Sequence, residues 1–296
     1  MKTKRNSVLE ILRLLASLWV MNYHGISLLS NTDLFSNGRI AVDFFFVLSG
    51  FFFLNGILKE IKTNNLFKDT AKFVWKRFKP LMFTFCFCMI FSLIYFIANY
   101  KGFLIDDLWG YLWYVPHLML VFAVYYILNR AIKNKKIFNI ITFVIVLICY
   151  TLILTNVTNF GLYRGFAGVG MGILISQIPT LKNENTKKVI PSVMFSLIFI
   201  SIISLVMFCP IAIQDPLCLI ILFPALIYFA NQINFSNYYI NKICSISFGL
   251  YCYQTVTRVL VNFNLVTNKC QLFFIVVILA ILDRFLVKFV YKKKSA

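Results

Sequence analysis

Long apolar stretches recur along the whole of this 296-residue chain, and they limit its possible folds more than any other feature. About twenty consecutive apolar residues are enough for a helix to cross the hydrocarbon core of a bilayer. Backbone polar groups in a bilayer must be satisfied within the segment itself, so each stretch is predicted to be a helix. We predict ten transmembrane helices, at residues 7–28, 39–60, 78–100, 109–129, 137–155, 160–178, 189–208, 213–232, 243–263 and 270–291.

The composition agrees with a membrane protein, because 60% of the residues are hydrophobic and only 13% are charged. Soluble proteins carry about 25% charged residues. The basic start of the chain leads into an apolar stretch without a small-residue cleavage pattern, so this stretch is predicted to be the first span and not a signal peptide. We therefore expect an all-α polytopic membrane protein in which residues 1–296 form a single integral-membrane domain.

Basic residues concentrate in alternate loops, and this pattern predicts how the spans are oriented. The chain has 29 Lys and Arg residues and a formal net charge of +19. Most of them lie at the termini and in the loops after even-numbered spans, whereas the other loops hold only Arg39, Lys101 and Lys269. The positive-inside rule therefore places both termini in the cytoplasm. The net charge reflects membrane topology, and no nucleic-acid partner is expected.

Two ionisable residues, Arg13 and His24, lie inside the first predicted span. Three helical turns separate them within about 20°, so they share one helix face and lie about 16 Å apart along its axis. Ionisable side chains in a bilayer are costly and normally face a cavity or a polar partner. With the predicted orientation, Arg13 lies towards the cytoplasm and His24 towards the outer side. We expect this face to carry the functional site; a buried polar pair that holds helices together is the alternative.

Asp43 lies near the outer end of the second predicted span, close to the predicted depth of His24. A carboxylate that accepts a hydrogen bond from one imidazole nitrogen makes the other nitrogen a better base. Asp43 is therefore a candidate partner for His24, although an aspartate near a helix end is often interfacial. One sequence does not decide whether the two residues meet.

A basic segment precedes the third predicted span and contains Lys76 and Arg77. One interpretation is an amphipathic segment on the membrane surface, with lysine side chains that reach the headgroups. The other is a cytoplasmic surface that receives an anionic ligand, since an arginine can hold a phosphate through two parallel hydrogen bonds. Both interpretations stay open.

The fourth and sixth predicted spans carry further candidates. Trp113 and Tyr114 fit an aromatic belt at the outer membrane boundary. His117, the second of the two histidines, is either a satisfied interior residue or part of the site. Arg164 needs a partner or a cavity, because a guanidinium in a span is costly. Four glycines next to Arg164 allow neighbouring helices to approach closely: Gly165, Gly168, Gly170 and Gly172.

Several common site types are not expected in this chain. The eight cysteines lie in or near apolar stretches without metal-ligand spacing, so we interpret them as packing residues and expect no metal site. Neither a phosphate-binding loop nor a nucleophile elbow is visible in the sequence.

The motifs, taken together, resemble those of the acyltransferase 3 family of membrane O-acyltransferases. The spacing of Arg13 and His24 resembles the signature of the family's first span. One departure is Gln254, which stands where many members have a late histidine. The other motifs follow in family order: VDFFFVLSGFF at 42–52, VWKRFKPL at 74–81, LWYVPHL at 112–118, YRGFAGVGMGIL at 163–174 and ISFGLYCYQ at 246–254.

This resemblance implies transfer of an acyl group, usually acetyl, from acetyl-coenzyme A on the cytoplasmic side. The acceptor would be a hydroxyl of an extracytoplasmic or lipid-linked carbohydrate such as a surface polysaccharide. No permanently bound cofactor is implied, since acetyl-coenzyme A is a co-substrate. The family and the number of spans together place the protein in the cytoplasmic (inner) membrane.

The same resemblance suggests roles for particular residues. His24 would act as general base, oriented by Asp43, and the thioester would reach it through a tunnel lined by the first two spans. The developing oxyanion would need a donor, for which the Ser49–Gly50 backbone and Arg164 are candidates, and a covalent acyl-histidine is a further possibility. Arg13, Lys76, Arg77 and Arg164 would bind coenzyme A, and Ser49, Gly50, Trp113, Tyr114, His117, Tyr253 and Gln254 would line the site.

Two other functions compete with acyl transfer. A transporter or flippase for a glycolipid or polysaccharide precursor also combines about ten helices with arginines inside the membrane. No inverted repeat is visible in the sequence, which disfavours it slightly. A haem-binding redox protein with His24 and His117 as axial ligands is the third hypothesis.

Overall fold

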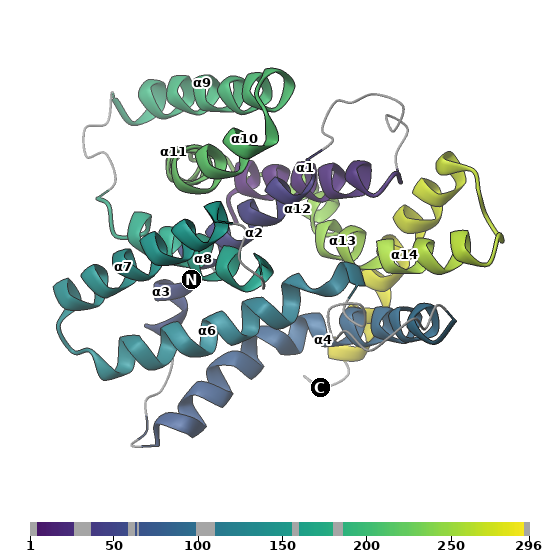
Figure 1. Cartoon of the computed structure of the whole chain (residues 1–296), viewed down its shortest axis with the longest axis horizontal. Coiled ribbons are helices and arrows are strands. Elements are labelled where there is room, and N and C mark those ends of the chain that lie inside the picture. Colours follow the sequence, from purple (N-terminus) through teal and green to yellow (C-terminus); the bar gives the residue numbers. More distant parts are fainter. Residues whose placement is uncertain are drawn as a thin grey trace. The chain divides into compact units, whose positions relative to one another are not determined.

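The computed structural model describes residues 5–26, 37–58, 63, 65–98, 110–155, 160–179 and 186–292. All regular elements in these ranges are helical, and no strand occurs in them, which confirms the all-α prediction (Figure 1). The elements are α1 (Ser7–Tyr23), α2 (Arg39–Phe51), α3 (Phe53–Ile57), α4 (Leu66–Ala98), the 3₁₀ turn η1 (Gly110–Leu112), α6 (Tyr114–Ala131), α7 (Lys135–Leu154), α8 (Phe160–Ile175), α9 (Thr186–Phe208), α10 (Ile211–Leu217), the π turn η2 (Cys218–Leu222), α11 (Phe223–Gln232), α12 (Tyr238–Cys244), α13 (Ser247–Asn262) and α14 (Lys269–Lys292).

Six helices in the described part of the chain are long and apolar enough to cross a membrane. Repeated helices of this kind indicate a multi-pass membrane protein. The predicted total of ten spans and the cytoplasmic position of both termini stay predictions. The six segments are Leu66–Ala98, Gly110–Ala131, Lys135–Leu154, Val189–Phe208, Gln214–Gln232 and Lys269–Val287.

Each predicted stretch overlaps helical structure, but four of them are divided, and the fourth consists of η1 and α6. The second consists of α2 and α3, and the ninth consists of α12 and α13. In the eighth, Pro216 in α10 is followed by the π turn η2 before α11 begins. A proline removes one backbone hydrogen bond, and a π turn is one way in which a helix continues past such a defect.

α4 begins earlier than the sequence predicts. Its 33 residues include both the basic segment and the following apolar stretch, with Pro80 inside the helix. The sequence analysis placed the start of this helix at residue 78, so the predicted start was too late. Pro80 does not end the helix, since prolines inside membrane helices are tolerated where neighbouring groups satisfy the freed carbonyl.

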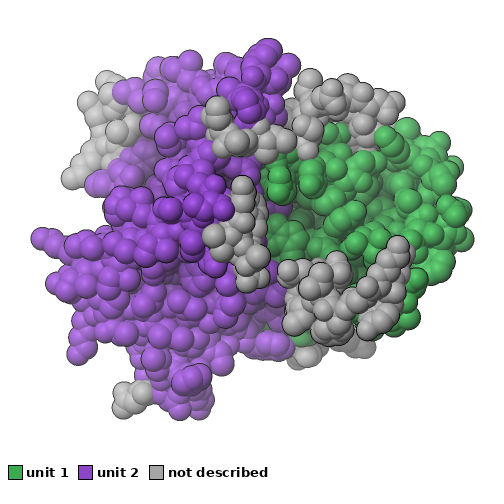
Figure 2. All heavy atoms as spheres, in the orientation of Figure 1, with its two compact units in different colours: residues 1–41, 79–113, 236–296 green, residues 42–78, 114–235 purple. Residues whose placement is uncertain are grey.

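The described contacts divide the chain into two compact units (Figure 2). Unit 1 comprises Met1–Ala41, Lys79–Trp113 and Ser236–Ala296. Unit 2 comprises Val42–Phe78 and Tyr114–Phe235. A single domain requires that these two units associate, so the predicted single integral-membrane domain stays a prediction.

Unit 1 is built around α13, whose side chains from Ser247 to Val259 are almost all buried. α1 packs against α12 and α13, and α13 packs against α14. The Ser17 hydroxyl on α1 donates to the Ser247 carbonyl oxygen at 2.8 Å, which joins α1 to the start of α13. α1 itself begins at a conventional cap, because the Asn6 side chain accepts from the backbone N–H groups of Val8 and Leu9.

Unit 2 is built around α8, which contacts α3, α6, α7 and α11. α8 and α2 approach each other closely at glycines of both helices. A methyl group on Gly172 of α8 would collide with the Val47 carbonyl oxygen of α2, and a methyl group on Gly50 of α2 would collide with the Val169 carbonyl oxygen of α8. Glycine at these positions therefore lets two helix backbones touch, as the sequence pattern predicts. Aromatic rings fill the other side of the unit, where Phe73 contacts Phe122 and Tyr126.

Candidate active site

His24 is the C-cap residue of α1, directly after Tyr23. Its imidazole stacks on the Tyr111 ring, with centroids 3.8 Å apart and 29° between the planes. The Tyr23 ring meets the imidazole edge-on, with centroids 4.9 Å apart. The described residues of unit 1 contribute no hydrogen bond to either ring nitrogen of His24. Ring contacts with Tyr23 and Tyr111 therefore set the orientation of the imidazole.

Tyr111 is itself held by α13. The hydroxyl of Tyr251, which is buried on α13, donates to the Tyr111 carbonyl oxygen at 2.6 Å. η1 and α13 also pack against each other. The central helix of unit 1 thus determines where the ring beneath His24 lies.

Arg258 completes this group of side chains. Its guanidinium carbon lies 3.8 Å from the Tyr95 ring centroid and 5.3 Å from that of Tyr111. Gly110 makes room for it, because a methyl group on this glycine would lie 2.7 Å from Nη1 of Arg258. Such contacts with aromatic faces stabilise a guanidinium. We refer to His24, Tyr95, Tyr111 and Arg258 as the His24 cluster.

Only one member of the His24 cluster, His24 itself, was assigned a role from the sequence. Arg258, Tyr95 and Tyr111 were assigned none. The arginine itself was the available signal, since a guanidinium in a span needs a partner. The two tyrosines carried no distinguishing pattern in a chain that is 18% aromatic.

Tyr253 and Gln254 are both buried on α13. The Tyr253 hydroxyl donates to Asp283 Oδ1 on α14 at 3.1 Å, and Thr84 donates to the same carboxylate at 2.9 Å. Gln254 Nε2 donates to the Leu250 carbonyl oxygen at 3.2 Å, and its Oε1 has no hydrogen-bond partner in the described part of the chain. Tyr253 therefore joins helices within unit 1. The predicted part of both residues in lining the site stays a prediction.

Arg164, in unit 2, lies between two carboxylates and is only 1% exposed. Its Nε donates to Asp43 Oδ1 at 2.7 Å, its Nη2 donates to Asp43 Oδ2, and its Nη1 donates to Asp215 Oδ2 at 2.9 Å. This arrangement ties α8 to α2 and α10. The expectation that Arg164 needs a partner is thus met by Asp43 and by Asp215, which the sequence analysis did not consider. The predicted contact of Asp43 with His24 would join the two units and stays a prediction.

Ser49 and Tyr114 are predicted site-lining residues that lie together in unit 2. Their side-chain oxygens are 3.1 Å apart, and the Tyr114 hydroxyl also donates to the Phe45 carbonyl oxygen at 3.4 Å. Gly50 follows Ser49 inside α2, so its backbone N–H belongs to a helix interior. Trp113 and His117 are both partly exposed, and their predicted roles stay predictions.

The predicted coenzyme A ligands differ in their surroundings. The Arg13 side chain is 37% exposed and pairs with Glu10 at 3.3 Å within α1. On α4, the Arg77 guanidinium carbon lies 3.2 Å from the Phe73 ring centroid, and Nη1 donates to the Phe73 carbonyl oxygen at 3.0 Å. Lys76 is exposed. Arg77 is therefore held in place on one face, next to a lysine that solvent can reach.

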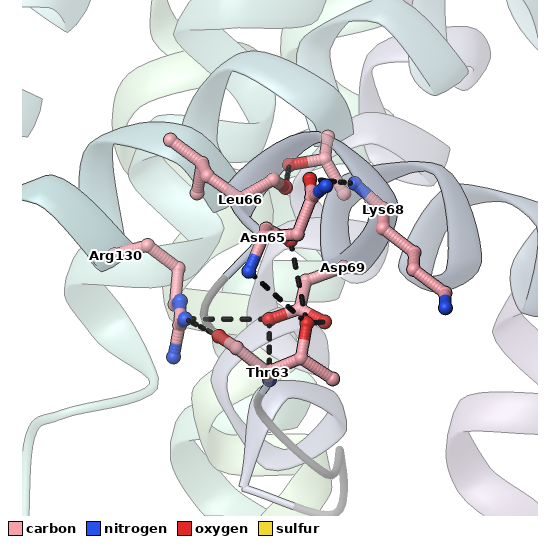
Figure 3. Close-up of polar contacts among 7 residues, drawn as sticks. Thr63, Asn65, Leu66, Lys68, Asp69 and Arg130 are labelled. Carbon is pink, nitrogen blue, oxygen red and sulfur yellow. Dashed lines mark hydrogen bonds and ion pairs between the residues drawn. The ribbon is translucent and has the colours of Figure 1, made fainter.

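A polar cluster at the start of α4 was not foreseen (Figure 3). The Asp69 carboxylate accepts from the backbone N–H and the hydroxyl of Thr63, both at 2.8 Å. Arg130, at the end of α6, donates to the Thr63 carbonyl oxygen at 2.9 Å and to Asp69 at 3.3 Å. This Thr63–Asp69–Arg130 cluster fixes the first turn of α4, two turns before Lys76 and Arg77.

A family model described as an acyltransferase domain matches residues 6–283, nearly the whole chain. The chain belongs to the acyltransferase 3 family. Searches of the curated proteins and of the solved structures gave no match. The matched range contains the His24 cluster, the ion pairs of Arg164 with Asp43 and Asp215, and the basic part of α4.

The general activity of this acyltransferase 3 family member is therefore acyl transfer. Acyl transfer to a hydroxyl requires a group that accepts the hydroxyl proton, and a neutral imidazole does so near physiological pH. His24 has this chemistry and an orientation set by neighbouring rings. In the described ranges, no group of three or more His, Cys, Asp or Glu residues is placed to hold a metal ion.

Proposed function

We propose that this acyltransferase transfers an acyl group, in the simplest case acetyl, from acyl-coenzyme A to a carbohydrate hydroxyl, with His24 as general base. The observation that carries the proposal is the His24 imidazole stacked on Tyr111. A general base must reach the proton that it removes in one defined orientation. The stack supplies that orientation without using either ring nitrogen.

The chemistry follows from this geometry. An imidazole nitrogen of His24 accepts the proton of the sugar hydroxyl while the hydroxyl oxygen attacks the thioester carbonyl carbon. The tetrahedral intermediate collapses with breakage of the carbon–sulfur bond, and an ester forms on the sugar. The imidazolium then returns the proton to the departing sulfur, so coenzyme A leaves as a thiol and His24 is regenerated.

The donor is proposed to bind through basic residues on the cytoplasmic side. Arg77 supports this assignment, because Phe73 holds its guanidinium while the neighbouring Lys76 is exposed. A guanidinium that is held in one orientation loses little conformational entropy when it binds a phosphate. Arg13 is the third candidate. The contacts of Arg164 favour a positioning role, in which it holds α8 against α2 and α10.

The acceptor is proposed to approach from the extracytoplasmic side, as a polysaccharide or a lipid-linked glycan. The predicted topology assigns the end of α1, the end of α4, the start of α6 and the end of α13 to the outer side. The members of the His24 cluster come from the ends of α1, α4 and α13 and from η1, which precedes α6. The contacts within unit 1 are therefore consistent with an acceptor-facing His24.

The test uses membranes that contain equal amounts of the wild-type chain, His24→Gln or His117→Gln. Each receives radiolabelled acetyl-coenzyme A and a glycan acceptor, and label is counted in base-labile ester. We expect His24→Gln to lose at least about 100-fold in rate, which is a common contribution of general base catalysis. His117→Gln tests whether loss of any histidine has this effect. Equal labelling by wild type and His24→Gln would contradict the proposal.

A further inference from the structure

We propose that Arg258 binds an anionic group, a carboxylate or a phosphate, that the carbohydrate acceptor carries near the hydroxyl to be acylated. This inference rests on the proposed function and names a class of acceptor for it. It assigns a substrate-binding role to a residue that the mechanism above does not use.

Arg258 differs from three other arginines whose ion pairs are described. Arg13, Arg130 and Arg164 each pair with one or two carboxylates of this chain. Within the described ranges, no carboxylate lies within ion-pair distance of Arg258, whose contacts are with the Tyr95 and Tyr111 rings. A guanidinium that is partly buried in a membrane protein is costly unless it meets a partner or a polar cavity. An anionic substrate is such a partner.

The orientation of the guanidinium suits an anion. Tyr95 covers one face of it, with 3.8 Å between the guanidinium carbon and the ring centroid. Stacking of this kind leaves the N–H groups, which lie in the guanidinium plane, able to donate two parallel hydrogen bonds to a carboxylate or phosphate. Gly110 adds space on the Nη1 side, since any side chain at this position would crowd that nitrogen.

The shared contact of Arg258 and His24 with Tyr111 suits a substituent of the acceptor sugar. His24 and Arg258 both contact the ring of Tyr111, so they are neighbours across one aromatic residue. An anion bound by Arg258 would lie beside the hydroxyl that His24 deprotonates, within the same sugar or the next one. Arg258 would thus select acidic acceptors and orient them towards the base.

The experiment compares three acceptors that share one oligosaccharide backbone: neutral, carboxylate-bearing and phosphate-bearing. Initial rates are measured for wild type, Arg258→Gln, Arg258→Lys and Lys269→Gln in detergent or nanodiscs, with acetyl-coenzyme A saturating. Lys269→Gln is the matched control, because it removes one positive charge from an exposed position of the same unit. The quantity compared is the ratio of kcat/KM for each acidic acceptor to that for the neutral one.

We expect wild type and Lys269→Gln to prefer one acidic acceptor by about 10- to 100-fold, which corresponds to a hydrogen bond with a charged group. The ratio should fall close to one in Arg258→Gln and take an intermediate value in Arg258→Lys, which keeps the charge without the planar fork. The preferred acidic acceptor identifies the anion as carboxylate or phosphate.

Two results would overturn the inference: a wild type without acidic preference, or an unchanged ratio in Arg258→Gln. An unchanged ratio with an equal loss of rate on all acceptors would indicate a structural role for Arg258. If Arg258→Gln does not fold, an unchanged ratio in Arg258→Lys would overturn it in the same way. Acylation of the neutral acceptor by wild type would support the proposed function even if the inference about Arg258 failed. A wild type that acylates none of the three acceptors would contradict both.

Discussion

The His24 imidazole lies on the Tyr111 ring at a centroid distance of 3.8 Å, and the carbonyl of Tyr111 accepts a hydrogen bond from Tyr251. This relationship links the residue that ends α1 to the central helix of unit 1 through one aromatic side chain. If His24 is the general base, its orientation depends on two residues that do not themselves transfer protons. The first two predictions follow from this dependence.

Replacement of Tyr111 by alanine removes the ring on which the imidazole rests. We expect kcat to fall by roughly 10- to 100-fold, because misplacement of a reacting group by about 1 Å has effects of this size. KM for acetyl-coenzyme A should change much less. Tyr111→Phe keeps the ring and is the matched control, so it should retain most of the wild-type rate. Steady-state labelling kinetics measure both constants, and a Tyr111→Ala enzyme with wild-type kcat would contradict the positioning role.

Tyr251→Phe removes only the hydroxyl that holds the Tyr111 carbonyl. A hydrogen bond of this kind contributes about 1 kcal/mol, which corresponds to a factor of roughly five. We therefore expect a few-fold decrease in kcat together with a small decrease in the thermal unfolding midpoint of the purified protein. Tyr253→Phe removes a hydroxyl of the same helix that contacts Asp283 instead. It should lower the unfolding midpoint without the same decrease in kcat, and equal kinetic effects of the two variants would argue against a specific role for Tyr251.

Most of the helices could be predicted from the sequence because apolar length is a local property. The exceptions lie near prolines: α4 begins before the predicted start at residue 78 and continues through Pro80, and the π turn η2 follows Pro216. Pairings between distant segments could not be predicted. The need of Arg164 for a partner could be predicted, but nothing local identified Asp215, which belongs to none of the matched motifs. The stack of His24 on Tyr111 depends on how η1 packs against α13. No hydrophobic periodicity in the sequence indicates this packing.

Arg164→Gln leaves Asp43 and Asp215 as buried carboxylates without their shared cation. Loss of one partner of a buried ion pair typically destabilises a protein by about 3–5 kcal/mol. We expect a strongly lowered unfolding midpoint and a poor yield after detergent extraction. Arg13→Gln is the comparison, because the Arg13 side chain is 37% exposed and pairs of this kind contribute about 0–1 kcal/mol. Fluorescence-detected size-exclusion chromatography after a heat series measures both. Similar midpoints for the two variants would show that the buried pair does not stabilise unit 2.

Gly172→Ala tests the close approach of α8 and α2. Alanine is the better helix former by about 1 kcal/mol, so helix propensity alone would make this variant more stable. The added methyl group would collide with the backbone around Val47 and Gly50, and rigid backbone cannot move aside cheaply. We expect a net destabilisation of about 1–3 kcal/mol. Gly165→Ala on the same helix is the control, because its methyl group would meet only side chains, the nearest atom at 3.1 Å. A stabilised Gly172→Ala protein would mean that the two helices are farther apart than the structure has them.

Asp69→Asn weakens the Thr63–Asp69–Arg130 cluster and thereby tests whether the start of α4 positions the basic residues that follow. The substitution removes the charge that faces Arg130 and one acceptor of the two Thr63 donors. If Lys76 and Arg77 bind acyl-coenzyme A, a less ordered first turn should raise KM for this donor by roughly 5-fold, the equivalent of one hydrogen bond, with kcat nearly unchanged. Lys135→Gln, an exposed substitution at the start of α7 on the same predicted side, controls for a general change of cytoplasmic charge. A decrease in kcat without a change in KM would instead place the effect of this cluster on the chemical step, and would remove the argument that it organises a donor-binding surface.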